Sequence, residues 1–447
     1  MISERTEVHF ISDTHSFYKW AIAECGRAAS LWNYTNYLYR QAFTGHHDLI
    51  PEYADLIDDE KFFNAFRLIK RMRSLKVVPF YTMVKPNVGM GIVTLVGQAW
   101  KGWFAALRSY KKDPSKFKGA PKMPGYKKKE KDGGVAVVPF TYQEARLQKD
   151  GSIKIRRDIT LPIRTRAKAI QQVRFVPVVG GINIEVIYRK EIQESKLDKT
   201  RCLGVDLGVN NLMSVTSNIE ASSMLVNGRQ LKSINRYFNK EMAHVQSTLA
   251  QQGLKTSRKL RYLQRKRNHA VKDYMHKASR LLVDYAAANN IGLIVIGYNP
   301  WWKDEVNLGA KNNQNFVHIP HAKLTKLVRY KFEELGGEVR EVNESHTSKC
   351  SFLDGEETCH HESYVGERVK RGLFRSACGK AINADLNGAA NILKRGIKAS
   401  WVPNETFFHP RLIDVEKSLR DKMYHPSQKV GSSGVLATPK PSNGLEC

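Results

Sequence analysis

Three acidic residues of this sequence stand where secondary-structure elements are predicted to begin or end. Asp206 lies in GVDLG, at the start of a predicted β-hairpin, with a glycine two residues away on each side. Glu344 lies in VREVNESHTSK, at the end of a predicted strand. Asp385 lies in INADLNGAANIL, at or near the start of a predicted helix. One such acid alone is usually structural, whereas three in this order predict a shared site.

The chemistry that such carboxylates support is the hydrolysis of a phosphodiester. That reaction needs a deprotonated water and neutralisation of the charge on a pentacovalent phosphate, and two Mg²⁺ ions about 3.5–4 Å apart supply both. Hard divalent ions prefer oxygen ligands, so the fold must bring carboxylates from separate elements into one cluster. An acid on the first strand, a second on a later strand and a third on the last helix is the arrangement of ribonuclease-H-like folds.

The stretch LIVIGYNPWWK raises the question of where the second acid lies. Its strand, Leu293–Ile296, stops at Gly297, although a strand end beside a phosphate is where a nuclease often places a carboxylate. In a ribonuclease-H-like sheet the strand order is 3-2-1-4-5, so Glu344 would end strand 5, about 4.8 Å beyond strand 4. A glutamate side chain spans that offset, and Gly297 leaves its path open.

Three other acids compete with Glu344 for this role. Asp304 and Glu305 follow the tryptophan pair and are expected on a surface loop. Glu341 alternates with Val342, so in a strand the two side chains point to different faces of the sheet. We therefore assign the second acid of the cluster to Glu344, at the end of its strand.

A large excess of positive charge is the strongest global feature of the 447-residue chain. Lys and Arg number 72 against 43 Asp and Glu, which gives a formal net charge of +29. Such an excess calls for a polyanionic partner. Because no stretch approaches the ~20 apolar residues of a membrane span and the N-terminus lacks a signal-peptide pattern, nucleic acid is expected and a membrane is not. Six scattered cysteines predict a reducing compartment.

The spacing of apolar residues divides the chain into segments of different type. Helical spacing comes first, followed by short β-branched runs that predict four or five antiparallel strands in a small barrel. From Cys202 onward strands alternate with helices, which predicts an α/β core with partly parallel strands. The predicted segments are 12–110, 111–199 with a basic lead-in, 200–343, an insert at 344–384, a final helix at 385–400 and a largely disordered tail at 401–447.

Several stretches of the chain resemble one known family. TnpB proteins, which are RNA-guided DNA endonucleases encoded by insertion sequences, are similar in their nuclease half to GVDLGVNNLMSVTS, KNNQNFVHIPHAKL, YKFEELGGEVREVNESHTSKCSFLDGE and RVKRGLFRSACGKAINADLNGAANILKR. The similarity is dense over residues 200–396 and looser over residues 12–200. The patterns IVIG-x-N-x-x-WK and ES-x-TSK-x-SFLDGE resemble the subgroup from insertion sequences with a serine recombinase, which is close to Fanzor and related to type V CRISPR effectors.

The resemblance implies a fold with α/β, α and β parts. These would be a ribonuclease-H-like RuvC nuclease domain, an N-terminal helical recognition domain and a small β-barrel wedge domain, with the insert loading the target strand. The resemblance also implies two Mg²⁺ ions, with Asp206, Glu344 and Asp385 as catalytic and metal-binding residues. Most relatives carry the second acid at the position of Gly297, and in this subgroup Glu344 is taken to replace it.

The partners that the resemblance implies are a guide RNA transcribed from the transposon end and a double-stranded DNA target beside a short adjacent motif. The protein would be cytoplasmic and nucleoid-associated in a prokaryote, or nuclear as a eukaryotic relative. One alternative is an RNA-guided DNA-binding repressor that has lost cleavage, since such descendants lose one or more of the acids. Another is a DNA transposase, which shares the metal chemistry. The number of copies that act together does not follow from the sequence.

The insert carries the remains of a zinc ribbon, which relatives often have between the second and third acids. In such a ribbon two C-x-x-C pairs place four thiolates around Zn²⁺. Here the pairs read Cys350-Ser-Phe-Leu and Arg375-Ser-Ala-Cys378, so each has lost one cysteine and no zinc is expected. Three residues between the pairs offer further ligand atoms that could complete a site: Cys359, His360 and His361.

A basic helix is predicted between Lys255 and Arg280, where ten residues are Lys or Arg and one, Asp273, is acidic. A merely solvated helix face usually mixes both signs, so this one is expected to contact phosphates. Such contacts give affinity without sequence specificity. The residues assigned to nucleic-acid binding are Arg258, Arg261, Arg265, Lys266 and Arg267 on this helix, and Lys303 and Arg375 near the predicted active site.

Overall fold

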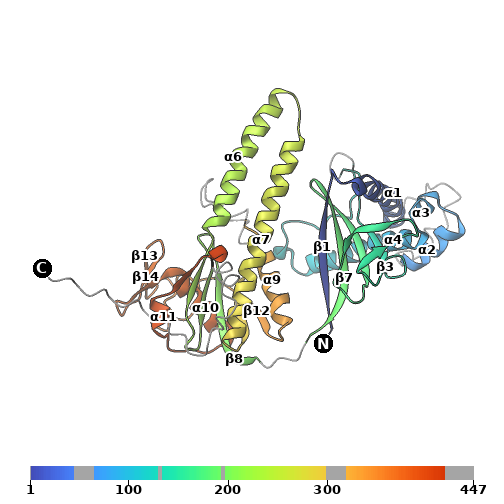
Figure 1. Ribbon diagram of the computed structural model, residues 1–447. Coiled ribbons are helices and arrows are strands. Elements are labelled where there is room, and N and C mark those ends of the chain that lie inside the picture. The colour runs from blue at the N-terminus through green and yellow to red at the C-terminus, as the bar shows by residue number, and fades with distance from the viewer. Residues whose placement is uncertain (1, 45–64, 129–132, 193–196, 299–318, 418–447) are drawn as a thin grey trace. The chain divides into compact units, whose positions relative to one another are not determined.

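The computed structural model describes residues 2–44, 65–128, 133–192, 197–298 and 319–417 (Figure 1). The chain divides into two compact units, one formed by Ile2–Glu191 and the other by Ile192–Cys447. No helix in the described ranges is long and apolar enough to cross a membrane. All three candidate acids lie within the second unit.

In its described residues, the first unit combines four α-helices with two antiparallel sheets. The larger sheet has the order β1-β7-β6-β2 and the smaller one the order β3-β4-β5. The strands are β1 (Ile2–Ser12), β2 (Val138–Thr141), β3 (Arg146–Leu147), β4 (Ser152–Lys154), β5 (Thr160–Arg164), β6 (Gln172–Val178) and β7 (Gly181–Glu191). The helices are α1 (Ser16–Thr44), α2 (Ala65–Ser74), α3 (Val78–Tyr81) and α4 (Pro86–Lys112), followed by the 3₁₀ turn η2 (Pro114–Lys116).

One hydrophobic core holds the helices and the strands of this unit together. Trp100 of α4 and Phe140 and Phe175 of the larger sheet are fully buried in it. The N-terminal strand β1 pairs along its whole length with β7. The change from helical to strand spacing near residue 110 therefore marks a change of secondary structure. It does not mark a boundary between two hydrophobic cores, because residues on both sides share one core. The strands of 134–192 are antiparallel as predicted, and a closed barrel and separate helical and β domains remain predictions.

The second unit is built on a six-stranded sheet with the order β12-β11-β8-β9-β10-β16. Strands β8 and β9 form an antiparallel hairpin, β9 pairs antiparallel with β10, and β11 is parallel to both β8 and β12. Numbered along the chain, the first five strands have the predicted order 3-2-1-4-5. The bounds are β8 (Asp198–Leu207), β9 (Asn211–Ser217), β10 (Met224–Asn227), β11 (Ile291–Tyr298), β12 (Glu338–Asn343) and β16 (Arg411–Ile413).

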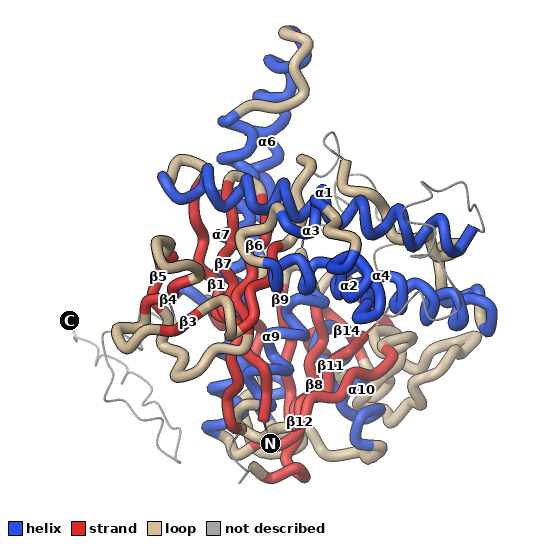
Figure 2. Tube along the Cα trace, turned by 90° about the vertical axis from the view of Figure 1, so that its right-hand side faces the viewer, coloured by secondary structure: helices blue, strands red, loops and turns tan. Residues whose placement is uncertain are grey.

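Helices cover both faces of this sheet, and alternation along the strands decides which side chain meets which helix. Leu203, Val205 and Leu207 share a core with α7 (Arg258–Ala288) and α9 (His321–Glu333). On the other face, Cys202, Leu293 and Val295 pack against α10 (Ala384–Ile397). Figure 2 shows β8, β11 and β12 side by side in this unit. Asp206, an even-numbered residue of β8, therefore lies on the α10 face.

The remaining helix α6 (Arg229–Gln251) forms a long hairpin with α7 that extends beyond the sheet (Figure 1). The insert between β12 and α10 contains a small antiparallel sheet with the order β13-β14-β15. Its Phe352 and Phe374 share a core with Leu386 of α10. The strands are β13 (Glu367–Lys370), β14 (Leu373–Arg375) and β15 (Ala381–Asn383).

Part of the segment that the sequence assigned to a disordered tail belongs to the fold. After α10 the chain forms the short helix α11 (Glu405–Phe408) and the strand β16, which pairs parallel with β10. Phe407 and Val415 are buried, and Glu416 forms an ion pair of 3.0 Å with Lys277 of α7. The prediction of a disordered tail is therefore wrong for residues 401–417. The rest of the predicted tail lies outside the described residues.

Candidate active site

A close approach of helix α10 to strand β8 brings two of the three acids together. A Cβ atom placed on Gly204 would lie 2.3 Å from the carbonyl oxygen of Ala389 and 2.6 Å from Cβ of Leu393. Only a glycine lets the helix backbone come this near. Asp206 lies two residues further along β8 on the same face, and Asp385 lies in the first turn of α10.

The carboxylate of Asp206 lies at the centre of the cluster. A Cβ atom on Gly388 of α10 would be 2.9 Å from Oδ2 of Asp206, so this glycine leaves the room that the carboxylate fills. The pKa of Asp206 is raised well above its ordinary value, first by burial and then by the negative charges of Glu344 and Asp385. The guanidinium of Arg368 acts in the opposite direction and lowers it. The three acids therefore form one electrostatically coupled group.

Asp385 is held by the helix terminus and by two polar neighbours. The side chain of Asn383 caps α10 and accepts a hydrogen bond of 2.9 Å from the backbone N–H of Asp385. Nδ2 of Asn211, at the start of β9, donates a 2.8 Å hydrogen bond to Oδ2 of Asp385. A nitrogen of Arg368 lies 3.6 Å from the other carboxylate oxygen. Cap and partners fix the direction in which this carboxylate points.

Glu344 reaches the cluster across the space that Gly297 leaves open. Its backbone N–H donates to the carbonyl oxygen of Tyr298, which places Glu344 beside the end of β11. A Cβ atom on Gly297 would meet Oε2 of Glu344 at 3.1 Å and Cβ of Glu344 at 3.3 Å. Any larger residue at 297 would compete with Glu344 for the same space. The geometry that the sequence predicted for this pair is thus present.

The chemical state of Glu344 is unusual for a surface glutamate. Burial raises the pKa of its carboxyl to about 7. Its Oε2 atom is buried and has no hydrogen-bond partner among the residues that the structure describes. A buried carboxylate oxygen without a partner is costly unless a proton or a cation satisfies it. Asp206, Asp385 and Glu344 together offer a set of hard oxygen ligands that fits a divalent cation such as Mg²⁺.

The competing acids do not join this cluster within the part of the chain that the structure describes. Glu341 forms an ion pair with Arg329 of α9, on the opposite face of the sheet from α10. This agrees with the strand alternation expected between Glu341 and Val342. Asp304 and Glu305 lie outside the described residues, as do Lys303 and the tryptophan pair.

Two polar residues at the site carry no signal in the sequence that would have identified them. Arg368 lies on β13 of the insert, and Asn211 follows the tight turn between β8 and β9. The sequence assigned a role near the active site to Arg375 instead. Arg375 lies on β14 and faces Glu367, with an N–O distance of 3.8 Å. Of these two insert arginines, Arg368 is the one that the structure places beside the acids.

The predicted nucleic-acid residues on α7 lie along the first half of that helix. Arg258, Arg261 and Lys266 are exposed, which suits contacts with phosphates. Arg265 lies over the ring of Tyr262, with 5.6 Å to the ring centroid. Arg267 is half-buried and donates a 2.8 Å hydrogen bond from Nε to Asn235 of α6, so this arginine also joins the two helices of the hairpin.

Replacing Arg368 by alanine is expected to strengthen binding of a divalent cation to the metal-free protein at pH 8 by about two- to tenfold. The removed positive charge repels a doubly charged ion more than the proton that the ion displaces. Isothermal titration with Mg²⁺ in the absence of nucleic acid measures the change. Arg375→Ala is the matched control, because it removes the same charge from the neighbouring strand and should leave the affinity unchanged. Equal changes in both variants would contradict a local role for Arg368.

The sheet order and the three carboxylates give the second unit the arrangement of a ribonuclease-H-like fold. Two family models match within the chain: OrfB_IS605, described as a probable transposase, over residues 185–301, and the TNB domain of Cas12f1-like proteins over residues 321–392. The chain is thus similar to TnpB-like proteins and to Cas12f1, a type V CRISPR effector.

Two curated relatives show this similarity. A TnpB-like protein, ORF457, of Acidianus two-tailed virus is 29% identical over 47% of this chain and 45% of its own length. The CRISPR-associated endodeoxyribonuclease Cas12f1 of Sulfoacidibacillus thermotolerans is 24% identical over 47% of this chain and 49% of its own length. The chain thus spans about half the length of the curated relatives it matches. A solved Cas12f1–sgRNA–target DNA complex is similar over 85% of this chain and 82% of that chain, at 13% identity and a TM-score of 0.49.

Proposed function

We propose that this protein is a transposon-encoded, RNA-guided and Mg²⁺-dependent endonuclease that cuts double-stranded DNA next to a short adjacent motif. The observation that carries the proposal is the cluster of Asp206 on β8, Glu344 directly after β12 and Asp385 on α10. The relationship to TnpB-like proteins and to an endodeoxyribonuclease supports DNA as the substrate.

The carboxylates of Asp206, Glu344 and Asp385 would hold the two Mg²⁺ ions. Bound there, the ions would activate a water molecule and neutralise the charge that develops on the phosphate. The chain's own contribution is to fix the ligands. Asn383 and Asn211 hold Asp385, and the space at Gly297 admits Glu344.

The partners follow from charge and from the family. A net charge of +29 suits a protein that binds both a guide RNA and a target DNA. The exposed Arg258, Arg261 and Lys266 give α7 a basic surface for phosphates. Specificity would come from base pairing between guide and target, while the protein reads duplex shape and the adjacent motif.

The main alternative is an RNA-guided DNA-binding repressor without cleavage. Such a protein typically lacks one or more of the acids, whereas all three are present here and electrostatically coupled. The coupling favours the enzyme, because three carboxylates kept close together destabilise a fold that does not bind a cation.

Purification with RNA co-expressed from the protein's own locus, followed by incubation with a guide-matched plasmid library, tests the proposal. Cuts that need Mg²⁺ and a matched guide, and that Asp206→Asn abolishes, are the expected result. Guide-dependent binding without cuts would establish the repressor. Strand joining without a guide requirement would instead establish the transposase.

The raised pKa of Glu344 predicts how binding of the metal depends on pH. A metal ion binds the deprotonated carboxylate, so below pH 7 protons compete and the apparent Mg²⁺ affinity should fall about tenfold per pH unit for each proton displaced. Titrations at pH 6, 7 and 8 measure this slope. In Glu344→Gln, Mg²⁺ no longer displaces a proton from residue 344. The apparent Mg²⁺ affinity should therefore depend less steeply on pH than in the wild type. A slope unchanged by this substitution would show that another group titrates.

The same pKa predicts the pH dependence of stability without metal. Between the ordinary glutamate value of 4.5 and about 7, the folded protein binds a proton at Glu344 that the unfolded chain does not. Folded stability should therefore fall as pH rises through this window, and added Mg²⁺ should restore it. Thermal unfolding at several pH values, with and without Mg²⁺, measures both effects.

A further inference from the structure

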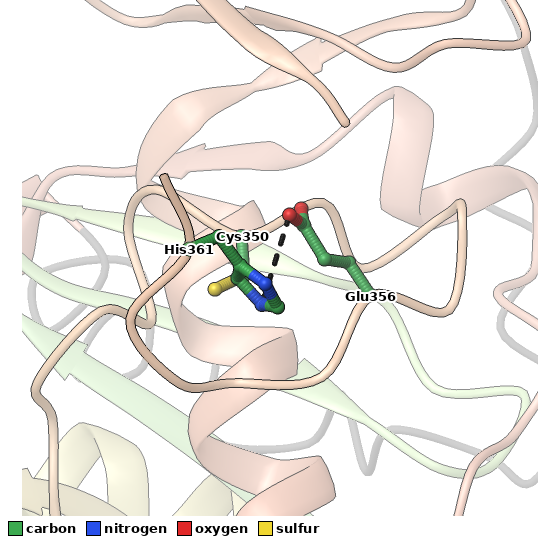
Figure 3. Close-up of side chains that lie close together, drawn as sticks. All are labelled: Cys350, Glu356 and His361. Atoms are coloured by element: carbon green, nitrogen blue, oxygen red, sulfur yellow. Dashed lines mark ion pairs between the residues drawn. The ribbon is translucent and has the colours of Figure 1, made fainter. Parts of the chain in front are cut away.

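A second group of metal-ligating side chains lies in the insert, apart from the three acids. Figure 3 shows Cys350, Glu356 and His361 pointing toward one another on a single loop. Their ligand atoms, Sγ, a carboxylate oxygen and a ring nitrogen, all lie within 4.8 Å of one another. Nε2 of His361 is 3.9 Å from Oε1 of Glu356. Cys359 lies outside this group of three but is adjacent to it, because its Sγ is 3.3 Å from the same Nε2, and it could supply a fourth ligand by a side-chain rotation.

We propose that Cys350, Glu356, Cys359 and His361 bind one zinc ion. In a tetrahedral site with Zn–S near 2.3 Å and Zn–N or Zn–O near 2.0–2.2 Å, neighbouring ligand atoms lie about 3.3–3.8 Å apart. Nε2 of His361 lies 3.3 Å from Sγ of Cys359 and 3.9 Å from Oε1 of Glu356, which is close to this range. Two thiolates, an imidazole and a carboxylate are a ligand set that suits zinc better than magnesium.

This site differs from the ribbon whose loss the sequence indicated. Cys378 points to Ser376, with Sγ 3.0 Å from its hydroxyl oxygen, and is not a member of the group. The two arms of the lost ribbon are joined by Asp354, whose carboxylate accepts 2.6 Å and 2.8 Å hydrogen bonds from the Ser351 hydroxyl and the Ala377 N–H. The spacing that excludes a two-armed ribbon therefore does not exclude a site within one loop.

The burial of the ligands suits a site that a zinc ion can enter from solvent. Cys350 is fully buried and the side chain of Glu356 is 3% exposed, so two ligands form a fixed base. Backbone N–H groups of Ser351 and Val365 hold the two oxygens of Glu356, and each oxygen keeps a lone pair for a metal. Cys359 is exposed, and its Sγ contacts Nε2 of His361.

The histidine completes the site at the cost of one contact. His361 is 28% exposed, and its Nε2 lies 2.8 Å from the carbonyl oxygen of Glu357. The ring gives up that contact when Nε2 ligates the metal. Zinc thus replaces one hydrogen bond by a stronger bond and closes the loop 350–361 around itself.

The loop is connected to the segment that carries Glu344. Arg395 of α10 donates hydrogen bonds to the carbonyl oxygens of Thr358, in the loop, and of Asn343, directly before Glu344. Asn387 and Asn391 of the same helix donate 2.8 Å hydrogen bonds to the carbonyl oxygen of Cys350. Zinc at this loop would therefore rigidify the strand end from which Glu344 extends. Zinc binding itself does not depend on the proposed function.

Metal analysis of the purified full-length chain tests the site. After reconstitution with Zn²⁺ under reducing conditions and dialysis, we expect one zinc per chain, and Co²⁺ in its place should give thiolate-to-cobalt absorption. Cys359→Ser and His361→Ala should each lower the zinc affinity at least tenfold. Cys359 and His361 are on the surface, so near-ultraviolet circular dichroism should show an unchanged fold.

Two matched variants separate this site from others. Cys378→Ser removes an exposed thiol of the lost ribbon and should leave one zinc bound, and Asp206→Asn should do the same because it alters only the acid cluster. Absence of zinc in the wild-type chain overturns the proposal. So does a loss of zinc in Cys378→Ser as large as in Cys359→Ser, or full retention in Cys359→Ser.

Discussion

Replacing Glu344 by glutamine is expected to lower guide-directed DNA cleavage by more than about 100-fold, since changes of groups outside a metal's own ligands already cost about 10- to 100-fold. Glutamine keeps the size of the side chain and removes its charge. Because burial raises the pKa of Glu344 to about 7, its neutral form is already well populated in the metal-free fold near neutral pH. The variant should therefore unfold at no lower temperature than the wild type.

The matched control is Glu341→Gln, on strand β12 and three residues before Glu344. Glu341 faces Arg329 of α9 and lies on the other side of the sheet from Asp385. Its loss removes a partly exposed ion pair, which costs at most about 1 kcal/mol, and should leave cleavage within about twofold of wild type. Initial rates on a supercoiled plasmid with saturating guide measure both variants. Normal cleavage by Glu344→Gln would show that another acid completes the site.

The fold of the second unit follows closely from local sequence signals. Short apolar runs predicted β8, β9 and β11. The order 3-2-1-4-5 was expected from the ribonuclease-H-like arrangement that the three acids indicate, and the sheet has this order. The same reasoning placed Asp206 and Asp385 at element ends. Glu344 needed a further step, because its place in the cluster depends on the absence of a side chain at Gly297 and not on any motif of its own.

What the sequence could not predict depends on contacts between distant residues. Strand β1 pairs with β7 across more than 160 intervening residues, and no local pattern records that pairing. Strand β16 has three residues, two of them exposed, so its apolar periodicity is too short to detect. Arg368 reaches Asp385 only because the hairpin of the insert folds back on α10. Each of these features is set by tertiary packing.

The metal ligands of the insert illustrate the same limit. Cysteine spacing shows that each arm of a two-armed ribbon lacks one cysteine. The cysteine spacing gave no indication of Glu356. Its side chain is buried and accepts hydrogen bonds from the backbone N–H groups of Ser351 and Val365. A carboxylate is an inconspicuous ligand in a chain with 43 acids, and its role is visible only once the loop is folded.

The second large effect concerns the fold that carries the acids. Gly204→Ala should destabilise the second unit by about 1–3 kcal/mol or more, because the new methyl group would meet the backbone of α10 and not a movable side-chain end. For a unit of this size, each kcal/mol lowers the unfolding temperature by about 2–4 °C. Helix α10 would also shift and carry Asp385 away from Asp206, so cleavage should fall together with stability.

Gly297→Ala is the comparison that separates packing from chemistry. Its methyl group would first meet Cδ1 of Ile392 at 2.6 Å, the far end of a flexible side chain, so a smaller loss of stability is expected than for Gly204→Ala. The next contacts are with Glu344, and displacement of that carboxylate should weaken Mg²⁺ binding and cleavage. Thermal unfolding and Mg²⁺ titration of both variants distinguish the two effects. If Gly204→Ala and Gly297→Ala lose equal stability, the end of β11 is packed as rigidly as β8 at Gly204. Glu344 would then be unable to adjust its position when a metal binds.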